Sequence, residues 1–336
     1  MARRKRPEGR APAARPRAAP RTSARQEPSA NQEPSANQEP SAKQEPSAKQ
    51  EPSAKQEPSA AETEKLQKVL AELGYGSRRE LERWISAGRV EVNGETAQLG
   101  QRVSGADTIR VDGRSTGRAP QTGCRVLLMN KPAGVICTRR DPEGRRTIFD
   151  DLPSLRQGRW ISVGRLDVQT SGLLLLTNDG ALAHRLMHPS TGLDREYAVR
   201  VNGQLDEAQL RALKSGVIVD AERLQFSDIR YYNGSGTNHW YHVVLMEGRN
   251  REVRRLFESV GLTVSRLKRV RFGPVIMPST VRSGRCLEMG EKDLRAFYQL
   301  LKLPLALPSG RRTGARNRPE TQKSVLLPYP KLTPSA

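Results

Sequence analysis

One carboxylate in the chain has a sequence environment that could support covalent chemistry. Asp167 lies in Gly164-Arg-Leu-Asp-Val-Gln-Thr-Ser-Gly172, between an expected extended segment and a Thr-Ser-Gly turn, and a buried strand is expected to follow. Residues two apart in extended chain point to the same side, so Arg165 and Asp167 should share a face. A guanidinium favours the charged form of a neighbouring carboxylate, which can then act as a nucleophile. An Asp beside a turn can also be a turn-forming residue, so spacing alone leaves both interpretations open.

A second group of candidate residues is basic. The segment 250–260 has the spacing of an amphipathic helix, with an apolar stripe made of Val253, Leu256, Phe257 and Val260. Arg251, Arg254 and Arg255 form the adjacent stripe, which could face a cleft. For Arg251 and Arg255, contact with phosphate or with solvent is the interpretation we favour.

Other chemically capable residues carry weaker signals. His184 and His188 are four apart, but no Glu follows the first His as in a zinc-binding H-E-x-x-H motif. The three cysteines form no C-x-x-C pair, so we expect no zinc site and no disulfide. No other pattern in the sequence suggests a metal or an organic cofactor. Trp160, Trp240 and Tyr241 favour core or edge packing over stacking on RNA. Asn233-Gly-Ser-Gly236 lacks the Lys of a phosphate-binding loop and predicts a hairpin turn.

The charge of the chain predicts a polyanionic partner. The net charge is +21, of which residues 61–303 carry +11, so the basic ends do not account for all of it. Lysines and arginines that neutralise phosphates release condensed counterions, which favours nucleic acid as the partner. Residues 1–62 combine an Arg-rich start with six near-perfect Gln-Glu-Pro-Ser-Ala repeats, and residues 304–336 are again rich in Pro, Gly and Arg. Both ends predict disordered basic tails.

Targeting signals are weak throughout. The N-terminus has no apolar stretch of the kind found in secretory signals, and no run of 18 apolar residues could cross a bilayer. We therefore expect a cytoplasmic protein without a membrane partner, and a monomer is the default expectation.

Residues 63–112 have the pattern of a small RNA-binding module. Helical spacing from Leu66 to Leu73 ends at Gly74, and Ser77 with Glu80 forms a capping box that starts a second helix. A short strand then enters an Asn-Gly turn. The exposed sides carry Arg78, Arg79, Arg83 and Arg89. The stretch resembles an S4-type RNA-binding domain, and a polar linker over 113–122 follows it.

Residues 123–303 alternate irregularly between strand-like runs and helical patterns near 179–187, 206–215, 250–260 and 291–302, which favours an α+β domain. The Asp167 segment resembles the catalytic motif of the ribosomal pseudouridine synthases. Further similar stretches are Cys137–Arg145, Arg195–Arg200, Glu247–Glu258 and Ser265–Gly273. The resemblance covers about 65–303 and is strongest to the members that act on large-subunit RNA.

The resemblance implies a catalytic domain with a central, mainly antiparallel mixed sheet, and an isomerase that converts uridine to pseudouridine in 23S ribosomal RNA without a cofactor. It makes Asp167 the attacking carboxylate, Tyr197 a platform for the flipped base, and Arg254 the partner of Asp167. Arg165 would lie beside the RNA or fill the gap left by the flipped nucleotide. Lys268 departs from the residue that relatives often carry.

Two other functions stay open on the sequence. A non-catalytic RNA-binding assembly factor would use the same basic surfaces, but the presence of Asp167 in its motif argues against it. A hydrolytic N-glycosidase would need two carboxylates, and the motifs contain one among basic residues. Whether Asp167 attacks C1′ or C6, which uridine of the large-subunit precursor is modified, and what the tails do are also open.

Overall fold

The computed structural model describes residues 63–117, 123–305 and 323–329. The expected tail at 1–62, residues 118–122 of the expected linker and residues 306–322 and 330–336 of the expected C-terminal tail lie outside the described residues. The two ordered parts, 63–117 and 123 onwards, are therefore described separately.

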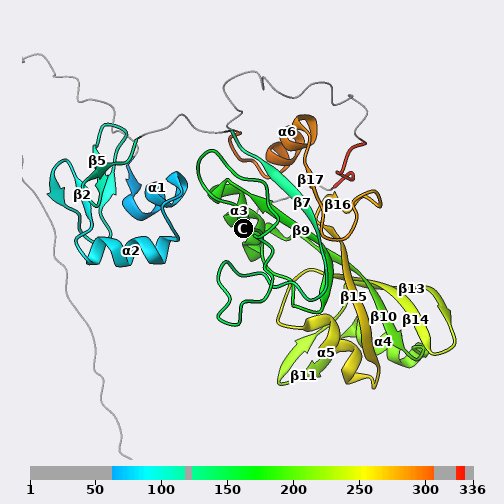
Figure 1. Cartoon of the computed structure of the whole chain (residues 1–336). Coiled ribbons are helices and arrows are strands. Elements are labelled where there is room, and N and C mark those ends of the chain that lie inside the picture. The colour runs from blue at the N-terminus through cyan, green and yellow to red at the C-terminus, as the bar shows by residue number, and fades with distance from the viewer. Residues whose placement is uncertain (1–62, 118–122, 306–322, 330–336) are drawn as a thin grey trace, which may run out of the picture. The chain divides into compact units, whose positions relative to one another are not determined.

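The first part contains the two helices and the hairpin that the sequence predicts (Figure 1). Its elements are β1 (Glu64–Lys65), α1 (Leu66–Leu73), α2 (Arg78–Ser86), β2 (Val90–Val92), β3 (Glu95–Thr96), β4 (Arg102–Val103), β5 (Ile109–Val111) and β6 (Arg114–Ser115). Gly74 caps α1 with a left-handed φ of 95°, and Ser77 and Glu80 form the capping box of α2. Asn93 and Gly94 turn the chain with φ of 55° and 90°, as a tight hairpin requires.

The strand β6 corrects the expected boundary of this part. We expected a linker from residue 113, but Arg114 and Ser115 pair with β5, and Thr116 is buried. Asp112 and Gly113 both have positive φ, as Asn93 and Gly94 do after β2. They form a second tight turn, which returns the chain to the sheet instead of starting a linker.

The second part is built on one mixed sheet of nine strands in the order β13-β14-β10-β15-β9-β7-β17, with β16 beside β15 and β8 beside β9 (Figure 1). The strands are β7 (Val126–Lys131), β8 (Ile161–Ser162), β9 (Thr170–Thr177), β10 (Arg195–Asn202), β13 (Asp228–Ser235), β14 (Asn238–Leu245), β15 (Thr263–Phe272), β16 (Val275–Ile276) and β17 (Cys286–Glu288). Among these described strands, only β9 and β15 pair in parallel. The α+β class and the mainly antiparallel sheet are thus confirmed.

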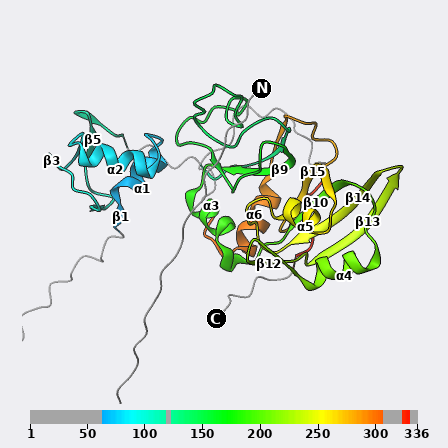
Figure 2. The same cartoon turned by 90° about the horizontal axis from the view of Figure 1, so that it is seen from below.

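Helices cover both faces of this sheet, but over different strands (Figure 2). α4 (Glu207–Ser215) and α5 (Glu252–Ser259) pack on β10, β14 and β15 together with the small hairpin β11 (Val217–Val219) and β12 (Glu222–Leu224). α3 (Gly180–Met187), the 3-10 turn η1 (Pro189–Thr191) and α6 (Glu291–Leu300) lie on the other side, where they pack on β7 and β9. All four helices lie where the sequence predicts them.

The parallel contact between β9 and β15 depends on one glycine. Gly172 pairs with Arg269 and has a φ of 100°. A Cβ built on Gly172 would lie 2.2 Å from the Arg269 carbonyl oxygen and 2.8 Å from its nitrogen. Both atoms belong to backbone, so a larger residue would force the two central strands apart.

Residues 323–329 correct the expectation of a fully disordered C-terminal tail. Val325 is 1% exposed, and Leu326 forms a β-bridge with Val275. The Tyr329 hydroxyl donates to an Asp194 carboxylate oxygen at 2.7 Å. Val325, Leu326 and this tyrosine give the segment apolar surface to bury, which the surrounding Pro, Gly and Arg do not provide.

Replacement of Gly172 by Ala should destabilise the chain by roughly 3 kcal/mol, because the clash with backbone adds to the strain of a positive φ. Urea unfolding checks this. Gly261→Ala is the matched control, since Gly261 has a φ of 80° and no atom within 4 Å of the position that a Cβ would occupy. It should cost only about 1 kcal/mol, the strain alone. Equal losses in the two variants would show that the β9–β15 approach is not the constraint.

Acid should weaken the contacts around Arg271. Its guanidinium binds Asp194 at 2.7 Å and Glu196 at 2.9 Å. Burial would raise the pKa of both carboxyls, but hydrogen bonds outweigh it and hold each pKa below its usual value. They come from Arg271 and Tyr329 at Asp194, and from His242 and Arg271 at Glu196. Their stabilisation is therefore complete above about pH 4.3, the ordinary pKa range of carboxyls, and lost as the pH falls through the lower folded values. Thermal unfolding from pH 7 to pH 3 should show a smaller acid loss for Arg271→Gln than for the unchanged chain.

Candidate active site

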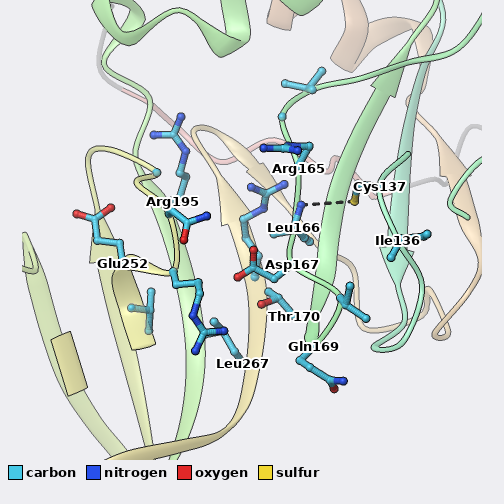
Figure 3. A pocket seen from close by; sticks show the side chains of 18 of the residues that line it. Ile136, Cys137, Arg165, Leu166, Asp167, Gln169, Thr170, Arg195, Glu252 and Leu267 are labelled. Carbon is cyan, nitrogen blue, oxygen red and sulfur yellow. Dashed lines mark hydrogen bonds between the residues drawn. The ribbon is translucent and has the colours of Figure 1, made fainter. Parts of the chain in front are cut away.

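The ends of β9, β10 and β15 and the start of α5 surround a cleft of about 930 Å³ (Figure 3). Among the residues that line it are Arg165, Asp167, Tyr197, Arg251 and Arg269. Segments more than 80 residues apart in the chain therefore supply one site, and the sheet positions all of them. The Asp167 carboxylate points into the space between its own segment and the side of the cleft that carries Arg195 and Glu252 (Figure 3).

Asp167 lies at the first position of a tight turn. Its carbonyl accepts a hydrogen bond from the Thr170 backbone nitrogen at 3.0 Å, and the Val168 carbonyl accepts one from Gly134 at 2.8 Å. The turn therefore runs through Val168 and Gln169, whereas the expected Thr170-Ser171-Gly172 turn is wrong, because those residues begin β9. The carboxylate is solvent-accessible and has no hydrogen bond or ion pair with any residue the structure describes.

The buried ammonium of Lys131 binds the backbone carbonyls of this turn. Lys131 is 0% exposed, and its Nζ donates to the carbonyl oxygens of Asp167 at 3.2 Å, Val168 at 3.4 Å and Thr170 at 2.9 Å. It also donates to the Pro132 carbonyl at 3.0 Å. Burial lowers the pKa of Lys131, and the charge of the nearby Asp167 carboxylate opposes that shift. The ammonium fixes the backbone of the turn while the carboxylate of Asp167 stays available to a ligand.

Three of the guanidinium groups in or beside the cleft are partly or fully buried. Arg269 is 3% exposed, and its Nε donates to the Leu173 carbonyl at 2.7 Å, which leaves one buried terminal nitrogen without a partner in the described residues. Arg195 donates to the carbonyls of Leu193 and Met246. Arg254 is half-buried and donates to the Val264 carbonyl at 2.8 Å. Together these groups make the site electropositive before any ligand binds.

Arg254 and Asp167, which we expected to pair, interact only through their charges in the described residues. The structure has no ion pair between these two described residues, although the Asp167 charge acts on Arg254. Burial is the largest effect on Arg254 and lowers its pKa; Arg251 adds to this and Asp167 opposes it. The Nε of Arg254 is buried without a partner among the described residues, so the guanidinium retains an unused donor near the cleft.

The other predicted residues separate into two groups. Arg165, Tyr197 and Arg251 line the cleft with Asp167, and Tyr197 is 8% exposed. Arg255 does not: its guanidinium binds Asp220 at 3.1 Å, Glu222 at 2.7 Å and the Val219 carbonyl. These contacts join α5 to the β11–β12 hairpin, which argues against the expected contact of Arg255 with RNA.

The arginines of the first part differ in the same way. Arg78, Arg79 and Arg83 are exposed on α2. Arg89 is bound by both oxygens of Asp112, at 2.8 and 2.6 Å, and lies 4.2 Å from the centre of the Trp84 ring. The three α2 arginines thus remain candidates for phosphate contact. Arg89 is also exposed, but its guanidinium is already paired with Asp112 of the same domain.

Sequence reasoning missed four groups at the site: Lys131, Arg195, Glu252 and Arg269. Strand alternation could have found two of them, because Arg195 is two residues from Tyr197 on β10, and Arg269 is two from the buried Leu267 on β15. Glu252 is 6% exposed and accepts a hydrogen bond from the Arg249 backbone nitrogen at 3.0 Å, at the start of α5. Burial raises the pKa of this carboxyl.

The described residues contain no group of three or more His, Cys, Asp or Glu side chains arranged to hold a metal ion. His184 and His188 contact one another, with ring centroids 5.6 Å apart. Within the same residues, no helix is long and apolar enough to cross a membrane.

Comparison with known protein families agrees with this geometry. The model of the RNA pseudouridylate synthase family matches residues 125–259, which contain Asp167, Tyr197 and Arg254. The S4 domain model matches residues 64–109. The two matches define the class as an RNA-modifying isomerase with an S4 domain.

Three relatives among the curated proteins are more than half identical in sequence to this chain. Ribosomal large subunit pseudouridine synthase B of Pseudomonas aeruginosa is 58% identical over 264 residues, which cover 77% of this chain and 68% of the relative. The proteins of that name from Vibrio cholerae and from Escherichia coli K12 are each 53% identical, over 72% of this chain and 76% and 84% of the relatives. The chain belongs to the RNA pseudouridylate synthase family.

Replacement of Lys131 by Met should lower kcat by tenfold or more, because the carbonyls that shape the Asp167 turn would lose their common donor and the carboxylate would shift. Removal of a buried charged donor should also reduce the free energy of unfolding by roughly 2–3 kcal/mol. Steady-state kinetics and RNA binding, both measured well below the unfolding temperature, check the first effect. The Kd for RNA should stay within about twofold.

Asn130→Leu is the matched control for Lys131→Met. Asn130 is the preceding residue of β7, is 7% exposed and donates to the Val281 carbonyl at 2.7 Å, away from the turn. It should lose stability without a comparable fall in kcat. If both variants lose kcat in proportion to stability, Lys131 has no positioning role.

Proposed function

We propose that this chain converts a uridine of large-subunit ribosomal RNA to pseudouridine, with Asp167 as the attacking carboxylate. The observation that carries the proposal is the accessible Asp167 side chain, which has no partner in the described residues and lies in a basic cleft beside Tyr197. The large-subunit substrate rests on the relatives named above.

The reaction needs the residue types found there. The bond between C1′ of ribose and N1 of uracil must break, the base must rotate, and C1′ must bond to C5; C5 then gives up a proton while N1 gains one. Asp167 can serve by attack at C1′ or at C6, and the proposal covers both routes. The guanidinium groups of Arg254 and Arg269 stabilise the anionic base as it leaves C1′.

Base extrusion accounts for the remaining cleft residues. A uridine stacked in a helix cannot reach Asp167, so it must be flipped out. Tyr197 then provides a flat surface beside the carboxylate, while Arg165 and Arg251, both exposed at the cleft, contact the RNA backbone. Arg78, Arg79 and Arg83 of the S4 part are proposed to hold RNA through phosphate contacts.

The buried Glu252 does not make the site a hydrolase. A glycosidase would use a second carboxylate to activate water, but the Glu252 carboxylate already accepts a hydrogen bond from the Arg249 backbone nitrogen in the turn that leads into α5. We take a monomer as the active form, because one chain supplies every residue that the proposed reaction uses. The substrate implies that the chain acts in the cytoplasm on ribosomal RNA or its precursor.

Asp167→Asn should lower product formation by roughly a thousandfold or more, because the isosteric amide cannot act as a nucleophile. Carbodiimide treatment and primer extension on large-subunit RNA would compare cells with the gene, without it, and with Asp167→Asn. One stop should disappear in both altered strains. Glu252→Gln, which keeps an oxygen acceptor for the Arg249 backbone nitrogen, should retain the stop.

Two results would contradict the proposal. Persistence of every large-subunit stop in both altered strains would exclude this substrate and favour a binding factor or small-subunit RNA. Release of free uracil from RNA by the purified chain would indicate hydrolysis.

A further inference from the structure

Part of the central sheet has a second face that no helix of the described residues covers. On β10 and β14 every buried residue points to the side of α4 and α5, as Val199 and Tyr241 do. None of the residues that alternate with them on these two strands is buried. The face opposite the cleft is therefore open over β10, β14 and the adjoining part of β15, whereas α3 and α6 cover it only over β7 and β9.

Positive side chains face one another across this surface. Arg200 of β10 is directly opposite Arg266 of β15, and Lys268 lies two residues further along β15, opposite Ala198. Like charges directly opposite each other destabilise a sheet. Arg200 donates only to the Ser265 hydroxyl, and none of the three cations has an ion pair with a residue the structure describes.

The acidic groups of the same face are already bound. Glu196 accepts from His242 at 2.7 Å and from Arg271 at 2.9 Å. Asp228 contacts Arg230 at 2.6 Å and Lys214 at 3.4 Å. The charges of Arg200, Arg266 and Lys268 thus stay uncompensated, and the sheet carries their repulsion unless an anion binds.

Aromatic rings flank the cations. Trp240 of β14 is the cross-strand partner of Arg200 on the side away from Arg266, and it is only half-buried. His242 lies two residues further along β14, opposite Ala198, and the exposed Tyr232 of β13 contacts it with ring centroids 5.5 Å apart. We expected Trp240 to serve in packing, but its position beside unpaired cations fits a stacking surface.

We propose that this open face, made of Arg200, Trp240, Arg266, Lys268, His242 and Tyr232, binds a second segment of the substrate RNA, distant from the target uridine. Unpaired cations bind the phosphates, and the rings stack on unpaired bases. An exposed sheet with aromatic residues is a known type of platform for single-stranded RNA. An acidic protein would satisfy the cations but would leave the rings without a role. The inference rests on the proposed function only for the identity of the RNA.

The test compares two triple variants of the full chain with equal charge changes. Arg200→Gln, Arg266→Gln and Lys268→Gln neutralise the open face. Arg211→Gln, Lys292→Gln and Arg295→Gln neutralise exposed residues of α4 and α6 as the control. The Kd is measured at several salt concentrations for two RNAs: a long large-subunit transcript and a short stem-loop with the mapped uridine.

The open-face triple variant should reduce the slope of log Kd against log salt by about 2–3 for the long transcript, which corresponds to about 0.7–0.9 per lost phosphate contact. Its kcat on the stem-loop should equal that of the unchanged chain. Trp240→Ala should weaken binding of the transcript by about tenfold with an unchanged slope, because stacking is not ionic. Thermal unfolding of each variant verifies the fold.

The proposal is overturned if both triple variants lose the same slope, which would indicate net charge alone, or if neither does. It is also overturned if RNA binding is unchanged while the open-face variant alone loses binding to an acidic protein. A failure of the proposed function looks different: the unchanged chain would form no pseudouridine in either RNA, whatever the binding slopes.

Discussion

The catalytic cleft depends on a buried ammonium that is neutralised by backbone carbonyls. Lys131 is fully enclosed by the protein, and a buried cation is stable only where acceptors surround it. The acceptors are the carbonyls of the Asp167 turn, so the requirement to solvate the cation dictates the path of the backbone. A carboxylate in the same place would also satisfy Lys131, but it would then be unavailable as a nucleophile. The fold thus uses main-chain dipoles to stabilise the lysine and leaves the reactive side chain unbound.

The guanidinium groups also differ in whether carboxylates or backbone carbonyls bind them. Arg255 and Arg271 are bound by pairs of carboxylates and join separate elements. Arg254 and Arg269 are bound mainly by carbonyl oxygens and each keep a buried nitrogen without a partner in the described residues. Carbonyls hold a guanidinium in position without cancelling its charge, so these two groups can stabilise negative charge that develops in the cleft.

The helices and part of the candidate site could be predicted from the sequence. Caps and periodicity located the helices, since Ser77 with Glu80 and the Val253–Leu256–Phe257 stripe are local patterns. Asp167 and Tyr197 followed from motif resemblance. Lys131 could not be found that way, because its role depends on strand pairing between β7 and β9, which are 39 residues apart at the Lys131–Thr170 contact. Arg255 was misjudged for a similar reason: its partners, Asp220 and Glu222, precede it by more than 30 residues in a hairpin that helical periodicity does not place.

A sheet that is covered over different strands on its two faces can carry two functions. Side chains alternate along β10 and β15, so Tyr197 and Leu267 belong to the cleft while Ala198 and Lys268 belong to the opposite side. A rigid pair of strands therefore fixes the cleft and the open face relative to each other, with no loop between them. An RNA that contacted both would have to pass around the sheet, and one such route crosses the edge strand β13, where Tyr232 lies exposed. Only a folded RNA much larger than a single stem-loop can do so, which makes the length of the substrate the variable that separates the two surfaces.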